Sequence, residues 1–242
     1  SCEKPIRWYH NIPIVSYVVL GGKCAHCGSR FDLRYPAVEL LTGLLAVACV
    51  AVFGLTPFAG RAFVFAAILV ALTYIDLEHW LLPHAITWSG IALGLLTAPL
   101  PGEPGMADAL IGAGAGFAGF WLLRVLASWL FKKEALGGGD LYLLAMIGAF
   151  LGWQALLPVV FLASLQGSVV GLLLVLVTRG REKRSGEDDA QHTDDEVDEA
   201  DDDWVPPANA VPFGPFLSLA AFEMLFLGEA IFHFIEVLIG VS

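Results

Sequence analysis

Two aspartates lie at the ends of apolar stretches, where ionisable side chains are usually functional. Asp76 comes at the end of one stretch, and Asp140 begins another, directly after Gly137, Gly138 and Gly139. If the two carboxyl groups meet, they can share one proton, because neighbouring like charges do not both ionise readily. The ionised partner can then activate water while the protonated partner polarises a carbonyl, and the glycines permit close backbone approach. This is the chemistry of metal-free peptide hydrolysis.

Plainer interpretations exist for both aspartates. Asp is a favoured N-cap residue, so Asp140 could simply cap the helix that follows the glycine run. Asp76 fits a structural interpretation less well, because an acid near a helix C-terminus opposes the macrodipole, although a boundary carboxylate can also just face water. Glu78 and Asp108 are interpreted as boundary acids of this ordinary kind.

The cysteines near the start of the chain indicate a metal site. Cys24 and Cys27 form a CxxC pair, whose tight turn directs two thiolates at one ion, typically zinc. Zinc prefers four ligands, Cys2 is the other cysteine nearby, and His10 or His26 could complete the set. We therefore expect a structural zinc ion held by Cys2, Cys24 and Cys27 in a loop-rich region. A redox pair is the alternative, and a cytoplasmic location disfavours it.

Composition places these residues in a membrane protein. Of the 242 residues, 57% are hydrophobic and 15% are charged, whereas soluble domains have about half and about a quarter. A transmembrane helix needs about 20 apolar residues. We expect an all-α polytopic membrane protein with about seven helices in the stretches 37–57, 60–77, 85–100, 107–131, 140–152, 156–178 and 211–240. The stretch 140–152 is short and could be a partial helix buried among its neighbours.

The basic residues orient this bundle. If the helices alternate in direction, eleven Lys and Arg residues fall on the N-terminal side and only Arg61 falls in the opposite loops. That asymmetry predicts that the N-terminal side is cytoplasmic. Asp76 and Asp140, which are 64 positions apart in sequence, then lie at this same face.

The acidic residues divide the chain. Residues 181–203 hold 12 of the 24 acidic side chains, which leaves 12 acidic and 10 basic residues elsewhere. With few apolar residues to bury, this stretch is expected to form a disordered cytoplasmic loop over 180–210. The remaining expected parts are a zinc-binding region at 1–35, a transmembrane peptidase core at 36–179 and a final transmembrane helix at 211–242.

Two other classes of protein explain parts of the pattern. An ion- or proton-coupled transporter also uses buried carboxylates, but it places them near the bilayer midplane rather than at its boundary. A membrane scaffold with a zinc-stapled docking region would explain the cysteines, but it would not require Asp76 and Asp140 to meet. The glycines at 112, 114, 116 and 119 are interpreted as a helix-packing surface, because small residues let membrane helices approach closely.

Taken in order, the motifs resemble those of the bifunctional type IV prepilin peptidases. The resemblance covers almost all of the chain except the acidic loop, and it rests on Cys2, Asp76 and the segments 6–13, 16–17, 22–27, 34–39, 82–83, 137–140 and 212–216. It implies a bacterial inner-membrane enzyme with eight spans, so that one span and one zinc cysteine would precede the first residue.

The resemblance also implies an activity. Type IV prepilins or pseudopilins would lose a short basic leader after a glycine at the cytoplasmic face, and S-adenosylmethionine would methylate the new N-terminal amine. The partners are thus pilin substrates and the lipid bilayer, with no nucleic acid. Asp76 and Asp140 match the family's two catalytic aspartates, and Cys2, Cys24 and Cys27 match three of its four zinc cysteines.

Two positions depart from the family pattern. His84 stands where an acid usually follows Leu-Pro, and Tyr142 stands where a lysine usually lies two places after the second aspartate. We expect cleavage to survive, with His84 adding a group that titrates near neutral pH. No glycine-rich strand–turn–helix indicates a methyl-donor site. Glu39 could orient the substrate amine, although a plain interfacial glutamate is the simpler interpretation.

Overall fold

The computed structural model describes residues 10, 12, 14–102, 104–131, 137–185 and 211–240. Cys2 and the acidic residues 186–210 lie outside this part. Within this part the regular structure is helical, apart from an isolated antiparallel β-bridge between the backbones of Lys23 and Arg30. The elements are α1 (Val15–Val19), α2 (Arg34–Phe53), α3 (Pro57–His79), α4 (His84–Thr97), α5 (Met106–Phe131), α6 (Gly138–Leu151), the 3-10 turn η2 (Trp153–Ala155), α7 (Leu156–Ser185) and α8 (Gly214–Ile239).

Each of the seven predicted apolar stretches contains a helix. Five helices in the described residues are long and apolar enough to cross a membrane, namely α2, α3, α5, α7 and α8. The other two, α4 and α6, have 14 residues each and are therefore about 21 Å long. The predicted helical, polytopic membrane class is confirmed, while the expected number of about seven spans stays a prediction.

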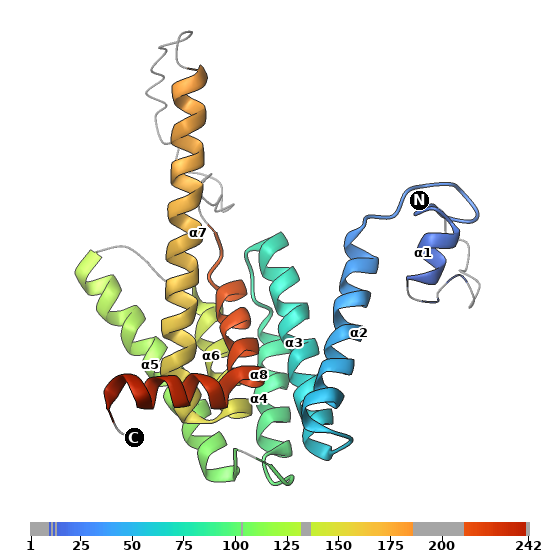
Figure 1. Cartoon of the computed structure of the whole chain (residues 1–242). Helices are drawn as coiled ribbons and strands as arrows, with labels where there is room; N and C mark the ends of the chain where they lie inside the picture. The colour runs from blue at the N-terminus through green and yellow to red at the C-terminus, as the bar shows by residue number, and fades with distance from the viewer. Residues whose placement is uncertain are drawn as a thin grey trace.

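Successive helices run in alternating directions, so that distant parts of the sequence meet at one end of the bundle (Figure 1). We call this end the α1 end, because α1 and the beginning of α2 lie there. The end of α3 and the beginnings of α6 and α8 lie at the α1 end as well, and α7 continues beyond the other helices on this side (Figure 1). The two aspartates on α3 and α6 are thereby brought to the same end.

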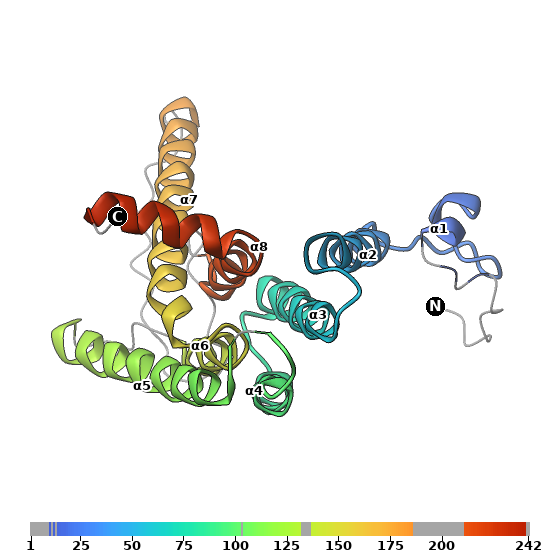
Figure 2. The ribbon, with the colours of Figure 1, turned by 60° about the horizontal axis from the view of Figure 1, so that its bottom comes forward.

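Helix α6 is the centre of the bundle. It packs against α4, α5, α7 and α8, and Figure 2 shows it between these helices while α2 lies to one side beside α3. From Asp140 to Phe150 every residue except Tyr142 is buried. A helix enclosed by protein does not need to match the thickness of the lipid. This explains why the stretch 140–152 is short, and it favours the interpretation of a partial helix buried among its neighbours.

Half of the predicted glycine packing surface is confirmed. A Cβ atom on Gly112 would lie against the carbonyl oxygen of Gly148, and one on Gly116 would lie 2.6 Å from the carbonyl oxygen of Leu144. Gly114 and Gly119 face open space instead. Glycines four residues apart lie on one face of a helix, so Gly112 and Gly116 let α5 approach the backbone of α6 directly.

Arg61, expected to be a loop charge, is a buried side chain that closes the far end of α6. Its guanidinium donates hydrogen bonds to the carbonyls of Ala149 at 3.1 Å, Phe150 at 3.2 Å and Pro104 at 3.4 Å. The last carbonyls of a helix have no partner within the helix. Arg61 satisfies two of them, and its positive charge complements the negative end of the helix dipole.

Replacing Arg61 with methionine is expected to destabilise the bundle by about 3 kcal/mol, because buried carbonyls lose charge-assisted hydrogen bonds. Thermal unfolding in detergent measures this effect. Arg61→Lys should fall between the wild type and Arg61→Met, since an ammonium group can serve only some of the three carbonyls. Equal stability of Arg61→Met and the wild type would contradict the capping role.

Candidate active site

Asp76 lies in the last turn of α3, and the chain turns sharply after it. The helix ends at Trp80, whose N–H donates to the Asp76 carbonyl oxygen at 2.9 Å. Trp80 has a φ of 53°, a left-handed conformation that costs a non-glycine residue roughly 1–2 kcal/mol. This turn directs the following Leu82–Pro83 segment back under the end of the helix, where Leu82 is buried.

Asp140 is the third residue of α6 and not its N-cap, so the capping interpretation is wrong. Gly137 occupies the N-cap position with extended backbone geometry. Asp140 lies within the first turn, where unpaired backbone N–H groups and the helix dipole stabilise a negative charge. Nearly the whole residue is buried, with 7% of its surface exposed.

The structure brings the two aspartates together at the α1 end. The carboxyl group of Asp140 lies within electrostatic reach of that of Asp76, and Asp76 is 5% exposed. Gly214, the first residue of α8, closes the site from a third side, because its backbone contacts the Asp76 carboxyl group. A Cβ atom on Gly214 would collide with Asp76 Oδ2.

Leu82 packs against both the glycine run before Asp140 and the beginning of α8. A Cβ atom on Gly139 would lie 2.7 Å from the Leu82 Cβ, and one on Gly214 would lie 3.5 Å from the Leu82 Cδ1. Of the three predicted loop glycines, Gly139 is therefore the one whose lack of a side chain is needed for close approach. The sequence had singled out Leu82 and Gly214 only as parts of motifs, without a role.

Arg124 is a second neighbour that sequence reasoning had left without a role. It lies on α5, and a Cβ atom on Gly138 would be 3.4 Å from its Nη1 atom. A guanidinium group thus lies directly beside the glycine run that precedes Asp140. From the sequence it was only a charge inside an apolar stretch, because the helix that faces it could not be known.

Several buried oxygen atoms at or near the site have no hydrogen-bond partner among the described residues. Among the described residues, Asp76 Oδ2, Thr73 Oγ1 and Ser218 Oγ are buried without a hydrogen-bond partner. Thr73 precedes Asp76 by one helical turn, and Ser218 follows Gly214 by about one turn. Buried polar atoms are normally paired, so these atoms offer partners for a water molecule or a peptide group at the junction of α3 and α8.

The two departures from the family pattern contact one another. The rings of His84 and Tyr142 meet edge to face with their centroids 4.8 Å apart. Trp88 and Phe117 pack on the same Tyr142 ring, at 5.5 Å and 5.7 Å. An aromatic contact in this chain therefore occupies the two positions where the resemblance implies an acid and a lysine. The two departures are therefore coupled through space by a direct ring contact.

This coupling predicts the outcome of a double-mutant cycle. His84→Asp and Tyr142→Lys should each lower thermal stability in detergent, because each places one charge against the partner's ring. The double variant should recover most of the loss, because the acid and the lysine can then pair, with a coupling of about 1 kcal/mol or more. Losses that simply add in the double variant would contradict the coupling.

The CxxC pair lies in a compact turn. The N–H of Gly28 donates to the Cys24 carbonyl at 3.0 Å, and the N–H of Cys24 donates to the Ser29 carbonyl at 2.8 Å. Such a turn places two sulfur atoms on one side and fits a tetrahedral ion. No group of three or more His, Cys, Asp or Glu side chains in the described part of the chain is arranged to hold a metal. Zinc binding with Cys2 stays a prediction.

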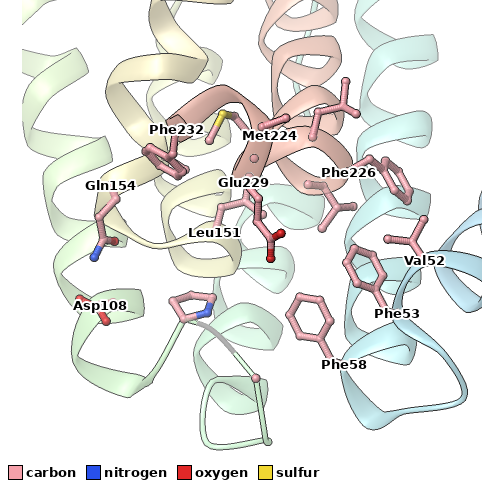
Figure 3. Close-up of a pocket in the computed structure, with 17 residues that line it drawn as sticks. Val52, Phe53, Phe58, Asp108, Leu151, Gln154, Met224, Phe226, Glu229 and Phe232 are labelled. Carbon is pink, nitrogen blue, oxygen red and sulfur yellow. The ribbon is translucent and has the colours of Figure 1, made fainter. Parts of the chain in front are cut away.

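A cavity of about 930 Å³ lies at the opposite end of the bundle. Figure 3 shows Phe53, Phe58 and Phe226 around it, with the carboxyl group of Glu229 directed into the space. Asp108 also borders this cavity and accepts a hydrogen bond from Trp153 Nε1 at 3.1 Å. The cavity is thus separated from Asp76 and Asp140 by the length of α3 and α6.

Comparison with known proteins agrees with this geometry. Residues 63–172, which include both aspartates, match the Type IV leader peptidase family, and residues 1–53 match the Bacterial Peptidase A24 N-terminal domain. The prepilin leader peptidase/N-methyltransferase of Myxococcus xanthus is 38% identical, with 94% of this chain and 79% of the relative covered. The proteins of that name from Aeromonas hydrophila and Pseudomonas aeruginosa are 38% and 36% identical over 95% of this chain and 71% of each relative. No solved structure matches the chain.

The fold and the site together define the class of protein. It is a mostly helical polytopic membrane protein with two buried aspartates at one end of its bundle. The chain belongs to the type IV leader peptidase family.

Proposed function

We propose that this protein is an aspartic endopeptidase that removes the basic leader of type IV prepilins and pseudopilins. One observation carries the proposal: Asp76 and Asp140 come from distant helices, are both buried, and lie within electrostatic reach of each other. Two carboxyl groups in this relation share a proton readily and can act as an acid–base pair. The names of the similar proteins supply the substrate class.

The cleavage step uses one aspartate as base and the other as acid. The ionised carboxylate removes a proton from water, whose oxygen forms a bond to the scissile carbonyl carbon while the protonated aspartate donates to the carbonyl oxygen. The C–N bond then breaks, and the leaving nitrogen receives a proton. Gly139 lets Leu82 approach, and Gly214 lets the beginning of α8 approach the Asp76 carboxyl group, while Thr73 and Ser218 offer further hydrogen bonds.

We place this reaction at the cytoplasmic face of the inner membrane. The α1 end holds the aspartates, and the excess of basic residues predicts that it is cytoplasmic. The apolar helix of a prepilin would enter between helices from the lipid, so that its leader junction reaches the α1 end. The parts of the chain then have separate roles: residues 1–35 as a zinc-stapled region, 36–179 as the peptidase core and 211–242 as the last span. The expected cytoplasmic loop at 180–210 begins later than predicted, because α7 continues to Ser185.

The second proposed activity is methylation of the new N-terminal amine. Bound S-adenosylmethionine supplies the methyl group, and the amine forms the new N–C bond as the C–S bond breaks and a proton leaves the nitrogen. Glu39, at the α1 end of α2, is the candidate for orienting this amine. Its Oε2 atom accepts a hydrogen bond from the Ile14 N–H at 3.1 Å, so it also fixes the segment before α1.

Purified protein incubated with a full-length prepilin and S-adenosylmethionine tests both activities. Intact-mass spectrometry should show loss of the leader and then gain of one methyl group on the mature chain. Leader loss without S-adenosylmethionine, followed by methyl gain on its addition, would separate the two steps. A prepilin that keeps its leader under all conditions would contradict the proposed function and return the transporter and scaffold classes to consideration.

A further inference from the structure

The cavity at the end of the bundle opposite the aspartates has a lining that suits an organic ammonium group. Its volume is about 930 Å³, which is at the upper end of the range of about 300–1,000 Å³ for small-molecule sites. Among the described residues, its lining includes two acids, Asp108 and Glu229, and no base, so a positively charged ligand group is favoured. We propose that this cavity binds the headgroup of phosphatidylethanolamine, a lipid whose headgroup ends in a primary ammonium.

Glu229 is the acid that faces the ligand. Figure 3 shows its carboxyl group directed into the cavity, and it makes no ion pair within the described part of the chain. Asp108, by contrast, already accepts a hydrogen bond from Trp153 Nε1 at 3.1 Å. An ionised carboxylate only accepts hydrogen bonds, and a primary ammonium group has three N–H donors. The quaternary ammonium of phosphatidylcholine has none, so Glu229 favours ethanolamine over choline.

Aromatic rings from three helices line the same cavity. Phe53 of α2 meets Phe58 of α3 edge to face with the ring centroids 4.9 Å apart, and it stacks with Phe226 of α8 at 6.0 Å. Gly102 has a φ of 125°, and a Cβ atom there would lie 2.9 Å from the Phe58 ring, so the connection between α4 and α5 closes on this ring. Aromatic rings attract cations, and they therefore reinforce the preference for an ammonium group that Glu229 establishes.

The course of α8 favours a lipid over a free amine. Every residue from Met224 to Ala230 lines the cavity, whereas a straight helix presents only one of its faces in this way. The later part of α8 accordingly runs across the bundle at a steep angle to α7 (Figures 1 and 2). Val52 and Leu227 both line the cavity and are 56% exposed. Acyl chains can cover these apolar side chains while the headgroup lies beside Glu229, and a free amine would leave them uncovered.

Lipid binding to the full chain in detergent tests this site. Native mass spectrometry compares phosphatidylethanolamine with phosphatidylcholine and with phosphatidylglycerol, which has no amine, for the wild type, Glu229→Gln and Glu236→Gln. Glu236 is the matched control, because it is an exposed acid of the same helix that does not line the cavity. The wild type should bind phosphatidylethanolamine about tenfold more tightly than either other lipid, and Glu229→Gln should lose this preference with the charge that attracts the ammonium. Glu236→Gln should stay within about twofold of the wild type.

Photolabelling and competition provide further readouts. A phosphatidylethanolamine with a photoreactive group on its headgroup should label peptides within residues 52–58 or 224–232, and melting temperatures without added lipid verify the fold of each variant. Equal binding of the three lipids by the wild type, equal losses in Glu229→Gln and Glu236→Gln, or a label at the α1 end would overturn this site. Displacement of the lipid by an equal concentration of water-soluble glycerophosphoethanolamine would overturn the assignment to a lipid. Leader cleavage does not enter these measurements, so their failure would leave the proposed function intact.

Discussion

Replacing Gly112 with alanine is expected to destabilise the bundle by about 3 kcal/mol. The added Cβ atom would meet the backbone carbonyl of Gly148, so the two helices can accommodate it only by moving apart. Because α6 is the central helix and carries Asp140, separation from α5 disturbs both the core and the site. Thermal unfolding in detergent measures the stability, and the initial rate of leader cleavage should fall with it.

Gly114 provides the matched control for this prediction. It lies on the same helix two residues away, and a Cβ atom there would meet nothing within 4 Å. Alanine is favoured over glycine in a helix by about 1 kcal/mol, so Gly114→Ala should be neutral or stabilising. Opposite signs for the two substitutions would support the close α5–α6 contact, and equal effects would contradict it.

Most of the fold could be predicted from local patterns. The apolar stretches alone indicated where helices lie, because burial in lipid requires continuous apolar sequence. Alternating direction then placed Asp76 and Asp140 at one face, and in the structure their carboxyl groups lie within electrostatic reach of each other. The short stretch at 140–152 remained ambiguous, since its length depends on the helices that enclose it.

The contacts between distant helices could not be predicted in the same way. Arg61 was interpreted as a loop charge, because nothing in its neighbourhood shows that α6 ends beside it. The contact of Gly214 with Asp76 joins residues 138 positions apart in sequence, and that of His84 with Tyr142 joins residues 58 positions apart. Such pairs depend on how helices pack, and a single sequence carries no periodicity that reports it.

The largest effect on activity is expected for the two aspartates. Asp76→Asn and Asp140→Asn each keep the size of the side chain but remove its ability to take up or donate a proton in the reaction. Either change should lower the rate of leader cleavage by about a thousandfold or more. Both variants should remain folded, because an amide fits the same space and needs no counter-charge when buried.

Asp108→Asn is the control for these variants. Asp108 lies at the opposite end of the bundle and accepts a hydrogen bond from Trp153, which the amide oxygen of asparagine can also accept. This variant should cleave at the wild-type rate, which separates the loss of an acid from the loss of the site.

The most direct measurement is the initial rate at which wild type, Asp76→Asn, Asp140→Asn and Asp108→Asn release the leader from a full-length prepilin in detergent. Matched melting temperatures show that all four proteins are folded. If the two buried aspartates act as one acid–base pair, both single variants lose cleavage while Asp108→Asn retains it. Cleavage at the wild-type rate by either Asp76→Asn or Asp140→Asn would contradict the pair as the catalytic site.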